Sequence, residues 1–344
     1  MRYPEFLPEN GTLGFAAPAF GCTIEPYRSC FDHALGRFAA LGYRTILGPN
    51  CYASEGIGIS STPEKCGREL TESYCSPESD VLISCGGGEL MCEDLDFVDF
   101  DRIRSARPKW FMGLSDNTNF TFLLNTLCDT ASIYGPCAAS FGMEPWDASI
   151  QDAWDLLHGR KLTETGYPLW EIESVKDEEH PLAPWNLTEP RVLKTYPEDA
   201  SGSPIQMEGR LIGGCLDILT LLVGTKFDRV AEFTERYRED GILWFIESCD
   251  LTVMSVRRAL WQMEHAGWFS HVRGFLVGRP YLYGQEMLGL DMYEAVTGIL
   301  GKYGVPIIMD ADIGHLHPAM PLIGGSYGKA SLKGQDLRID MELR

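Results

Sequence analysis

The first half of this chain shows a regular alternation of strand and helix signals. Short apolar runs predict buried strands, and apolar residues at helical spacing follow most of them. The predicted strands are 12–17, 43–47, 80–84 and 109–113. The predicted helices are 27–41, one that Thr62 caps ahead of Pro63, and 120–127. Repeated units of this length predict an α/β fold, with helices on both faces of a parallel sheet.

A second ordered region begins at Glu208 and carries the same signals. Its predicted strands are 211–214, 242–247, 274–277 and 305–310, its predicted helices are 216–222 and 253–263, and a hairpin is expected across 333–336. The stretch before it is rich in Pro, Glu, Asp and Trp and shows weak periodicity. We therefore predict an N-terminal α/β domain at 1–165, a linker or substrate-recognition segment at 166–207 and a C-terminal α/β domain at 208–344.

The charge balance argues against two classes of partner. The chain has 29 Lys and Arg residues against 49 Asp and Glu residues, which gives a formal net charge of −20. Nucleic acid polymers and anionic membranes both select surfaces rich in Lys and Arg. Neither is therefore expected as a partner of this protein.

The cysteines and the apolar runs bear on the cellular compartment. The chain has 11 cysteines and no C-x-x-C pair. This pattern indicates neither a zinc ribbon nor a disulfide framework, so we expect reduced, mostly buried thiols. The first residues lack a basic region followed by an apolar one, and no run of about 18 apolar residues occurs. We therefore expect a cytoplasmic protein that does not span a membrane.

The turn Gly113-Leu114-Ser115-Asp116 joins a predicted strand to a predicted helix. A serine at such a turn can be held exposed at the carboxyl end of a parallel sheet, beside helix N–H groups that can stabilise an oxyanion. The hydrolase signature G-x-S-x-G is not met, because Asn117 stands in place of its second glycine. Taken alone, helix N-capping by the Ser-Asp-Asn cluster is the simpler interpretation of this turn.

Three consecutive glycines, Gly86, Gly87 and Gly88, follow the predicted strand 80–84. Glycines at a strand end allow a ligand to approach the backbone closely, with an N–H group pointing into the site. The spacing does not match the dinucleotide fingerprint G-x-G-x-x-G. Two alternatives remain open for this turn: Gly86, Gly87 and Gly88 contact a substrate, or they form a tight turn without a function.

Two ionisable residues stand where they need partners. Glu247 follows four bulky apolar residues, so either a histidine that it orients or an ion pair with Arg257 or Arg258 would have to satisfy it. His315 lies in a glycine-flanked loop and suits a general base. Metal binding with His317 is the alternative, but no third ligand stands at a convincing spacing, and no metal site is predicted.

Taken together, these motifs resemble the L,D-carboxypeptidase family of serine peptidases (family S66), which includes the microcin C self-immunity proteins. The resemblance covers nearly the whole chain in matching order. Its elements are Ala16–Pro18, Gly86-Gly87, Gly113–Asp116, Gly213-Gly214-x-Leu216, Gly224-Thr225, Phe245–Glu247, Arg258-x-Leu260, Gly314-His315 and Pro321–Gly324. No single motif is decisive, but the ordered set is specific.

The resemblance implies a Ser–Glu–His triad. Ser115 matches the nucleophile, His315 the general base and Glu247 the acid that orients it. The backbone N–H groups of Asp116 and Gly87 would form the oxyanion hole. The implied fold is a flavodoxin- or Rossmann-like N-terminal domain and a smaller C-terminal domain of the swivelling β/β/α type. The resemblance implies no cofactor, and it implies that the protein forms a homodimer.

The substrate is less closely defined. Cys85 stands where murein-recycling members typically have arginine, which weakens the case for a murein tetrapeptide, and Cys215 stands where they often have asparagine. In the immunity branch a tryptophan in a comparable loop stacks on a nucleobase, and Trp185 is the candidate here, with packing of the loop as the alternative.

The favoured function is therefore an immunity-like serine carboxypeptidase that cleaves a small peptide or peptidyl-nucleotide amide. Release of terminal D-Ala from a murein tetrapeptide is the second hypothesis. A non-catalytic ligand-binding α/β protein, in which Ser115 and the glycine turn bind an anion, is the third.

Overall fold

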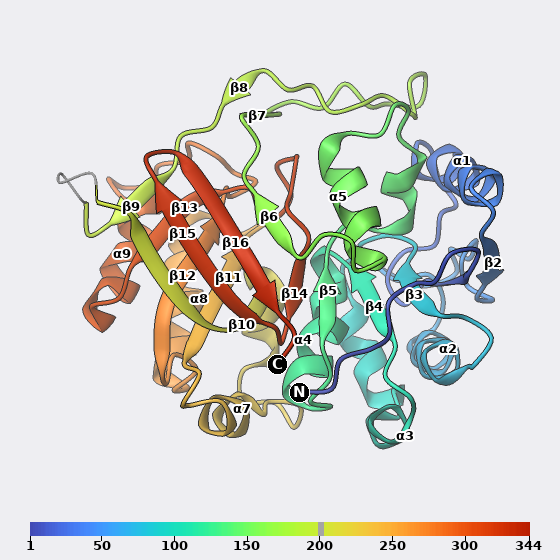
Figure 1. Cartoon of the computed structure of the whole chain (residues 1–344), viewed down its shortest axis with the longest axis horizontal. Helices are drawn as coiled ribbons and strands as arrows, with labels where there is room; N and C mark the ends of the chain where they lie inside the picture. Colours follow the sequence, from blue (N-terminus) through green and yellow to red (C-terminus); the bar gives the residue numbers. More distant parts are fainter. Residues whose placement is uncertain (199–202) are drawn as a thin grey trace.

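The computed structural model describes residues 1–198 and 203–344, so part of the predicted segment 166–207 lies outside the described residues. Two main sheets, with helices packed against them, form the body of the molecule (Figure 1). The chain ends lie close together, and the Tyr3 hydroxyl donates a 2.9 Å hydrogen bond to the carbonyl of Arg344. No helix within the described ranges is long and apolar enough to cross a membrane.

The first sheet has six strands in the order β14-β5-β4-β3-β1-β2. Its members are β1 (Thr12–Ala16), β2 (Arg44–Leu47), β3 (Val81–Ser84), β4 (Trp110–Gly113), β5 (Ser132–Tyr134) and β14 (Leu322–Gly324). Strands β1 to β5 run parallel, and β14 pairs antiparallel with β5. The carboxyl ends of the parallel strands therefore share one edge of the sheet.

Helices cover both faces of this sheet. They are α1 (Tyr27–Ala40), α2 (Pro63–Cys75), α3 (Phe100–Ser105), α4 (Thr118–Thr126) and α5 (Ala148–Leu157), with short 3-10 helices η1 (Met91–Phe97), η2 (Ser115–Asn117) and η3 (Ala138–Gly142). Ile83 of β3 packs with Phe38 of α1 and Trp154 of α5, whereas its neighbour Leu82 packs with Leu70 of α2 and Phe120 of α4. This follows from the strand geometry, which turns successive side chains to opposite faces.

The second sheet has eight strands in the order β6-β16-β15-β10-β11-β12-β13-β9. Its members are β6 (Thr163–Thr165), β9 (Lys194–Tyr196), β10 (Ile205–Cys215), β11 (Ile242–Glu247), β12 (Val272–Gly278), β13 (Ile307–Ala311), β15 (Tyr327–Lys333) and β16 (Asp336–Glu342). Strands β10 to β13 are parallel, and the outer pairings are antiparallel.

The helices of this half are α6 (Leu216–Leu222), α7 (Val230–Arg236), α8 (Val253–His265), α9 (Met292–Leu300) and the 3-10 helix η4 (Gly301–Tyr303). Trp244 and Ile246 of β11 pack with Leu260 of α8. The opposite face turns toward the first sheet, where the Phe245 and Tyr134 rings have centroids 5.6 Å apart. The two sheets therefore meet through packed side chains next to the end of β11.

Two strands cross between the chain halves. β14 comes from the C-terminal half and completes the first sheet, and β6 precedes position 166 but joins the edge of the second. A light-green segment that carries the small β7 (Leu169–Trp170) and β8 (Glu189–Pro190) pair runs across one end of the molecule (Figure 1). The domain boundaries 1–165, 166–207 and 208–344 stay a prediction.

The α/β class and most of the expected elements are confirmed. Thr62 caps α2 with Pro63 at its first position, β11 has its predicted bounds, and the hairpin β15–β16 turns at the expected residues. All 11 cysteines are free, and seven of them are buried, as the sequence predicted. Strands β5 and β14 and the helices α3, α7 and α9 were missed; β5 and β14 have three residues each, too few for a periodic signal.

Candidate active site

Ser115 lies two residues after the end of β4, at the carboxyl edge of the first sheet. Its backbone has a φ of 66°, in the left-handed region that residues other than glycine rarely adopt. Such strain is kept where surrounding structure enforces it, and it clusters at functional sites. Gly113 permits the turn, because a Cβ atom there would lie 2.7 Å from the Cβ of Asn117. The predicted sharp turn is therefore present, with the serine at its apex.

Asn117 stands where the hydrolase signature has its second glycine, and its side chain forms hydrogen bonds that a glycine could not make. Its side-chain amide donates to the carbonyls of Gly86 (2.8 Å) and Leu114 (3.0 Å), which ties the serine turn to the glycine turn. It occupies the N-cap position of α4 but makes no side-chain capping bond there. Capping, the simpler interpretation of the Ser-Asp-Asn cluster, does not explain this turn.

Three side chains predicted from separate parts of the sequence form one hydrogen-bonded line. The Oγ of Ser115 lies 2.9 Å from Nε2 of His315, and Nδ1 of His315 lies 2.7 Å from Oε2 of Glu247. Ser115 follows β4, Glu247 ends β11, and His315 lies in the loop after β13. Of the two alternatives considered for Glu247, the structure shows the contact with His315 and not the ion pair with Arg257 or Arg258.

Burial and charge shift the pKa values of Glu247 and His315 in opposite directions. Burial alone would raise the pKa of Glu247, but the charge of His315 and hydrogen bonds from His315, Tyr134 and Cys215 lower it below the usual range. Burial would lower the pKa of His315, yet the Glu247 carboxylate, together with Cys249, raises it well above the usual histidine value. Glu247 is therefore held ionised and favours the imidazolium form of His315.

Tyr134, the last residue of β5, is a fully buried part of this site that the sequence did not reveal. Its hydroxyl donates to Oε1 of Glu247 at 2.5 Å and accepts from the backbone N–H of Ser115 at 3.3 Å. One hydroxyl therefore links the serine turn to the acid of the other sheet. No local sequence signal marks this residue, since its role depends on where β5 meets β11.

We expect Tyr134→Phe to lower kcat/KM about tenfold to a hundredfold. The change leaves the Glu247 oxygen and the Ser115 N–H without their partner, and one unsatisfied buried group costs about 1–3 kcal/mol. The measurement is the rate and its pH profile beside those of Tyr167→Phe, which removes another buried tyrosine hydroxyl, one bonded to Asp152. Equal effects of the two changes on the pH profile would show that Tyr134 does not position the triad.

The glycine turn lies against the serine. A Cβ atom on Gly87 would lie 3.5 Å from the Oγ of Ser115, so this glycine leaves open the space beside the hydroxyl. A Cβ on Gly88 would meet the Asp116 carboxylate at 3.0 Å, whereas Gly86 has more room. The Asp116 carboxylate accepts from the N–H of Met91, and burial raises its pKa to about 7. The predicted oxyanion role of Asp116 and Gly87 concerns their N–H groups and stays a prediction.

Trp185 packs its loop onto the region next to the triad. Its ring stacks on His317 with centroids 3.9 Å apart and planes 11° from parallel, and its Nε1 donates to Oγ of Ser149. Burial lowers the pKa of His317 to about 3, so this imidazole is neutral. Trp185 and His317 line a pocket together with Leu114, which precedes the serine. The packing alternative is thus part of its role, and base stacking stays a prediction.

Side chains of types that can bind a metal ion converge at the same place. Among residues 1–198 and 203–344, one group of three has its ligand atoms within 4.8 Å of one another, namely Cys215, Glu247 and His315. The His315–His317 pair considered from the sequence is not that group, since His317 stacks on Trp185 instead. Cys215 joins the group because β10 and β11 pair with Cys215 opposite Glu247, a register that residue spacing does not reveal.

Family models match both halves of the chain. The model described as the LD-carboxypeptidase N-terminal domain matches residues 13–135, and the model of the C-terminal domain matches residues 208–329. The first match contains Ser115 and the glycine turn, and the second contains Glu247 and His315.

Curated relatives match nearly the whole chain, and solved structures share its fold. The microcin C7 self-immunity protein MccF of Escherichia coli is 26% identical over 92% of this chain and 89% of its own. The "Probable murein peptide carboxypeptidase" of Bacillus subtilis is 27% identical over 92% and 88%. An MccF-like protein from Bacillus anthracis has a TM-score of 0.83 at 20% identity over 100% of both chains. MccF in complex with aspartyl sulfamoyl adenosine has a TM-score of 0.81 at 22% identity over 99% of this chain and 98% of its own.

Proposed function

The chain belongs to the LD-carboxypeptidase family of peptidases, and from this premise we propose that it is a serine-type hydrolase with the triad Ser115, His315 and Glu247. The observation that carries the proposal is the line of two short contacts, 2.9 Å and 2.7 Å, that joins a strained serine to a histidine and a buried carboxylate. Packing of the two sheets alone does not require a strained serine, a histidine and a buried carboxylate to be in contact where the sheets meet.

The chemistry follows from the roles of these groups. The proton moves from Ser115 to Nε2 only when His315 is in its neutral form, which is populated as the pH rises toward its raised pKa, and Oγ then attacks the scissile carbonyl carbon. Glu247 accepts the hydrogen bond from Nδ1–H, which fixes the tautomer and stabilises the imidazolium as it forms. The N–H groups of Asp116 and Gly87 stabilise the oxyanion beside Oγ.

The second half of the cycle returns the proton. His315 donates it to the leaving nitrogen, the carbon–nitrogen bond breaks, and an ester with Ser115 remains. Water then loses a proton to His315 and attacks the ester. His315 returns that proton to the Ser115 oxygen as the carbon–oxygen bond breaks, and the acid product leaves. These steps need no metal or cofactor.

For the substrate we propose a small peptidyl-nucleotide amide, as in the immunity branch. The indole of Trp185 lines a pocket together with Leu114, the residue before Ser115, and so lies near the proposed scissile bond. Cys85 is buried with none of its surface exposed and offers no cation for a murein peptide carboxylate. The E. coli relative is a microcin C7 self-immunity protein, which supports the same choice.

The deciding experiment compares two substrates with the same purified protein. One is a peptidyl-sulfamoyl adenosine and the other a murein L,D-tetrapeptide, each assayed with wild type and Ser115→Ala. We expect cleavage of the nucleotide compound only. Release of D-Ala from the tetrapeptide alone would assign the protein to murein turnover, the function named for the Bacillus subtilis relative. Failure to cleave either compound, with no labelling of Ser115 by a fluorophosphonate, would favour the non-catalytic ligand-binding hypothesis.

We expect Trp185→Ala to raise KM for the nucleotide substrate about tenfold or more, with a smaller effect on a plain peptide. Stacking of one base is worth about 1–3 kcal/mol, and only the nucleotide substrate can lose it. Trp261→Ala is the matched control, because Trp261 is 53% exposed on α8, outside the pocket. Equal rises of KM for both substrates would remove the stacking role and leave Trp185 as a packing residue.

We also propose that the protein is cytoplasmic and that it forms a homodimer. Eleven free cysteines, seven of them buried, suit a reducing compartment. The homodimer rests on the family resemblance. Light scattering at assay concentration would measure the mass, and a monomer that keeps full activity would remove the dimer from the proposal.

A further inference from the structure

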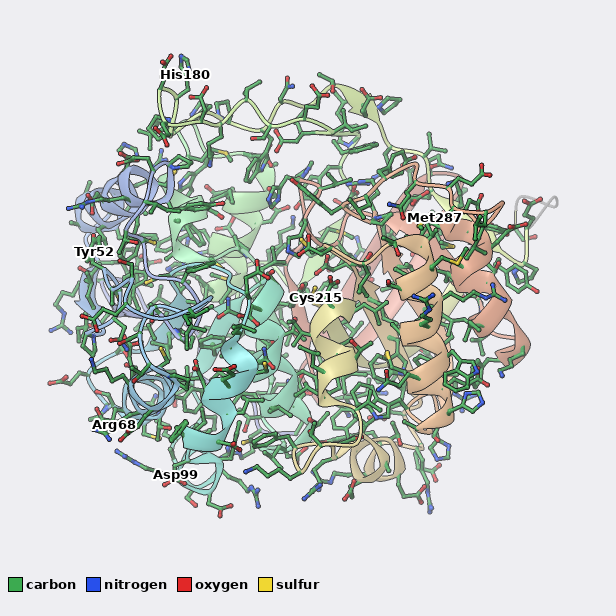
Figure 2. All side chains as sticks on the ribbon, turned by 180° about the vertical axis from the view of Figure 1, so that it is seen from behind. Tyr52, Arg68, Asp99, His180, Cys215 and Met287 are labelled. Atoms are coloured by element: carbon green, nitrogen blue, oxygen red, sulfur yellow. The ribbon has the colours of Figure 1, made fainter. Side chains whose placement is uncertain are left out.

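Two thiols lie beside the triad acid and base. Cys215 ends β10 and is paired in register with Glu247, and its thiol also lies 3.4 Å from the Asp217 carboxylate. Cys249 follows Glu247 by two residues and is among the groups that raise the pKa of His315. Figure 2 shows Cys215 in the middle of the molecule, at the start of α6. Neither thiol forms a bond or transfers a proton in the proposed hydrolysis.

We propose that Cys215, Glu247 and His315 form an inhibitory site for a borderline-soft divalent cation, with Zn²⁺ as the representative ion. This inference rests on the proposed function, since inhibition requires His315 to act as the base. The three ligand atoms lie within 4.8 Å of one another, and thiolate, carboxylate and imidazole are the ligand types that Zn²⁺ prefers.

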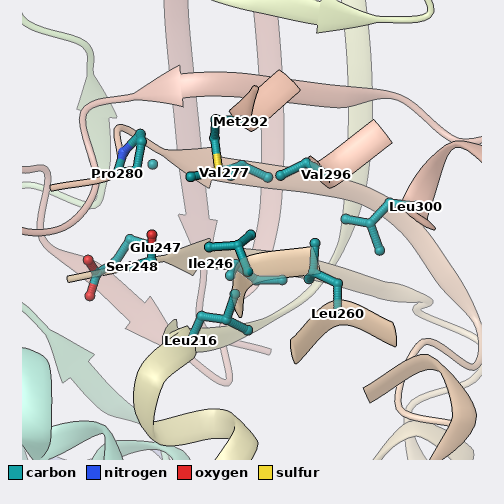
Figure 3. A pocket seen from close by; sticks show the side chains of 12 residues that line it. Leu216, Ile246, Glu247, Ser248, Leu260, Val277, Pro280, Met292, Val296 and Leu300 are labelled. Atoms are coloured by element: carbon teal, nitrogen blue, oxygen red, sulfur yellow. The ribbon is translucent and has the colours of Figure 1, made fainter. Parts of the chain in front are cut away.

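The surrounding backbone leaves room for these side chains. A Cβ atom on Gly314 would lie 2.5 Å from Oε2 of Glu247, and one on Gly278 would lie 3.0 Å from its Cβ. Two glycines therefore hold open the space around the carboxylate. A pocket borders the same place, with Glu247 and Ser248 at one end and apolar side chains such as Leu260 at the other (Figure 3).

Asp217 lies in the outer shell of such an ion. Its Oδ2 lies 3.4 Å from the Cys215 sulfur and accepts a 3.0 Å hydrogen bond from the backbone N–H of Cys249. In the metal-free protein this carboxylate accepts the Cys215 S–H, and once a cation has replaced that proton it adds negative charge next to the cation. Water can complete a tetrahedral set.

Binding exchanges protons for the metal without a change of oxidation state. The Cys215 thiol and Nδ1 of the His315 imidazolium each release a proton to solvent, and the freed electron pairs bind the cation. His315 keeps its Nε2 proton and cannot accept one from Ser115. Because protons leave on binding, inhibition should strengthen as the pH rises.

The test measures inhibition and metal binding separately. Hydrolysis is followed at fixed free Zn²⁺, set by a chelator, for wild type, Cys215→Ser and the control Cys75→Ser, whose thiol is half-buried and lies elsewhere. Serine keeps a hydroxyl next to Glu247 but removes the soft ligand. We expect the inhibition constant, relative to each variant's own metal-free rate, to rise at least about tenfold in Cys215→Ser alone. Excess chelator should restore the wild-type rate.

The second readout does not need activity. Co²⁺ added to Ser115→Ala should give a near-ultraviolet thiolate-to-cobalt absorption band, absent from Ser115→Ala/Cys215→Ser and from Ser115→Ala/Cys215→Ala. A band with no inhibition of wild type would place the metal at the thiol but contradict the role of His315. An unchanged inhibition constant in Cys215→Ser, or no band, would overturn the site. An inactive wild type that still gives the band would disprove the hydrolase proposal and leave the metal site standing.

Discussion

Ser115→Ala is expected to lower kcat by about 10⁶-fold while substrate binding changes by less than about threefold, because members of a serine triad act as a unit. The methyl group of alanine cannot attack the carbonyl carbon, and the tight contact with Nε2 of His315 disappears. Residual turnover should come from the oxyanion donors and from positioning alone. The measurements are single-turnover rates and calorimetric binding of the peptidyl-sulfamoyl adenosine.

The control for this change is Ser105→Ala, which removes an exposed hydroxyl at the end of α3. It should leave the rate and the labelling by a fluorophosphonate unchanged, whereas Ser115→Ala should lose all labelling. A variant without Ser115 that kept more than about a hundredth of the rate would exclude the serine as nucleophile. Weakened binding together with a lost rate would instead show that the turn itself had changed shape.

The parts of the site that could be predicted are those with a local signal. Ser115 follows β4 of the first sheet and Glu247 ends β11 of the second, so each stands at the carboxyl end of an apolar strand of its own sheet. The alternation of strand and helix was enough to predict these two strand ends, whereas their meeting between the two chain halves was implied by the family resemblance. The two-residue period of a strand explains the division of Ile83 and Leu82 between two cores.

The parts that could not be predicted depend on which strands become neighbours. Tyr134 reaches Glu247 because the first sheet meets the second, and Cys215 faces Glu247 because β10 and β11 pair in one register. β14 joins the first sheet across nearly 190 positions of sequence, from 134 to 322. Long-range pairings of this kind leave no periodic trace in a single sequence, so a linear division into domains does not anticipate them.

The second large effect concerns the acid of the triad. Glu247→Gln should lower kcat about 10⁴-fold, because the amide cannot stabilise the imidazolium and its NH₂ group must face either the Nδ1–H of His315 or the hydroxyl of Tyr134. The change should also shift the pH dependence. Burial lowers the pKa of His315, and the Glu247 carboxylate is the main influence that raises it.

Removing that carboxylate leaves burial dominant, so the pKa of His315 should fall. The acid limb of kcat/KM reports the base of the free enzyme and should therefore move to lower pH in Glu247→Gln, while the plateau drops. Glu235→Gln is the matched control, since it changes the charge equally at an exposed glutamate that contacts His271. Its profile should match that of wild type. An acid limb that stayed in place in Glu247→Gln would mean that a group other than His315 governs the rate, and the triad would have to be reassigned.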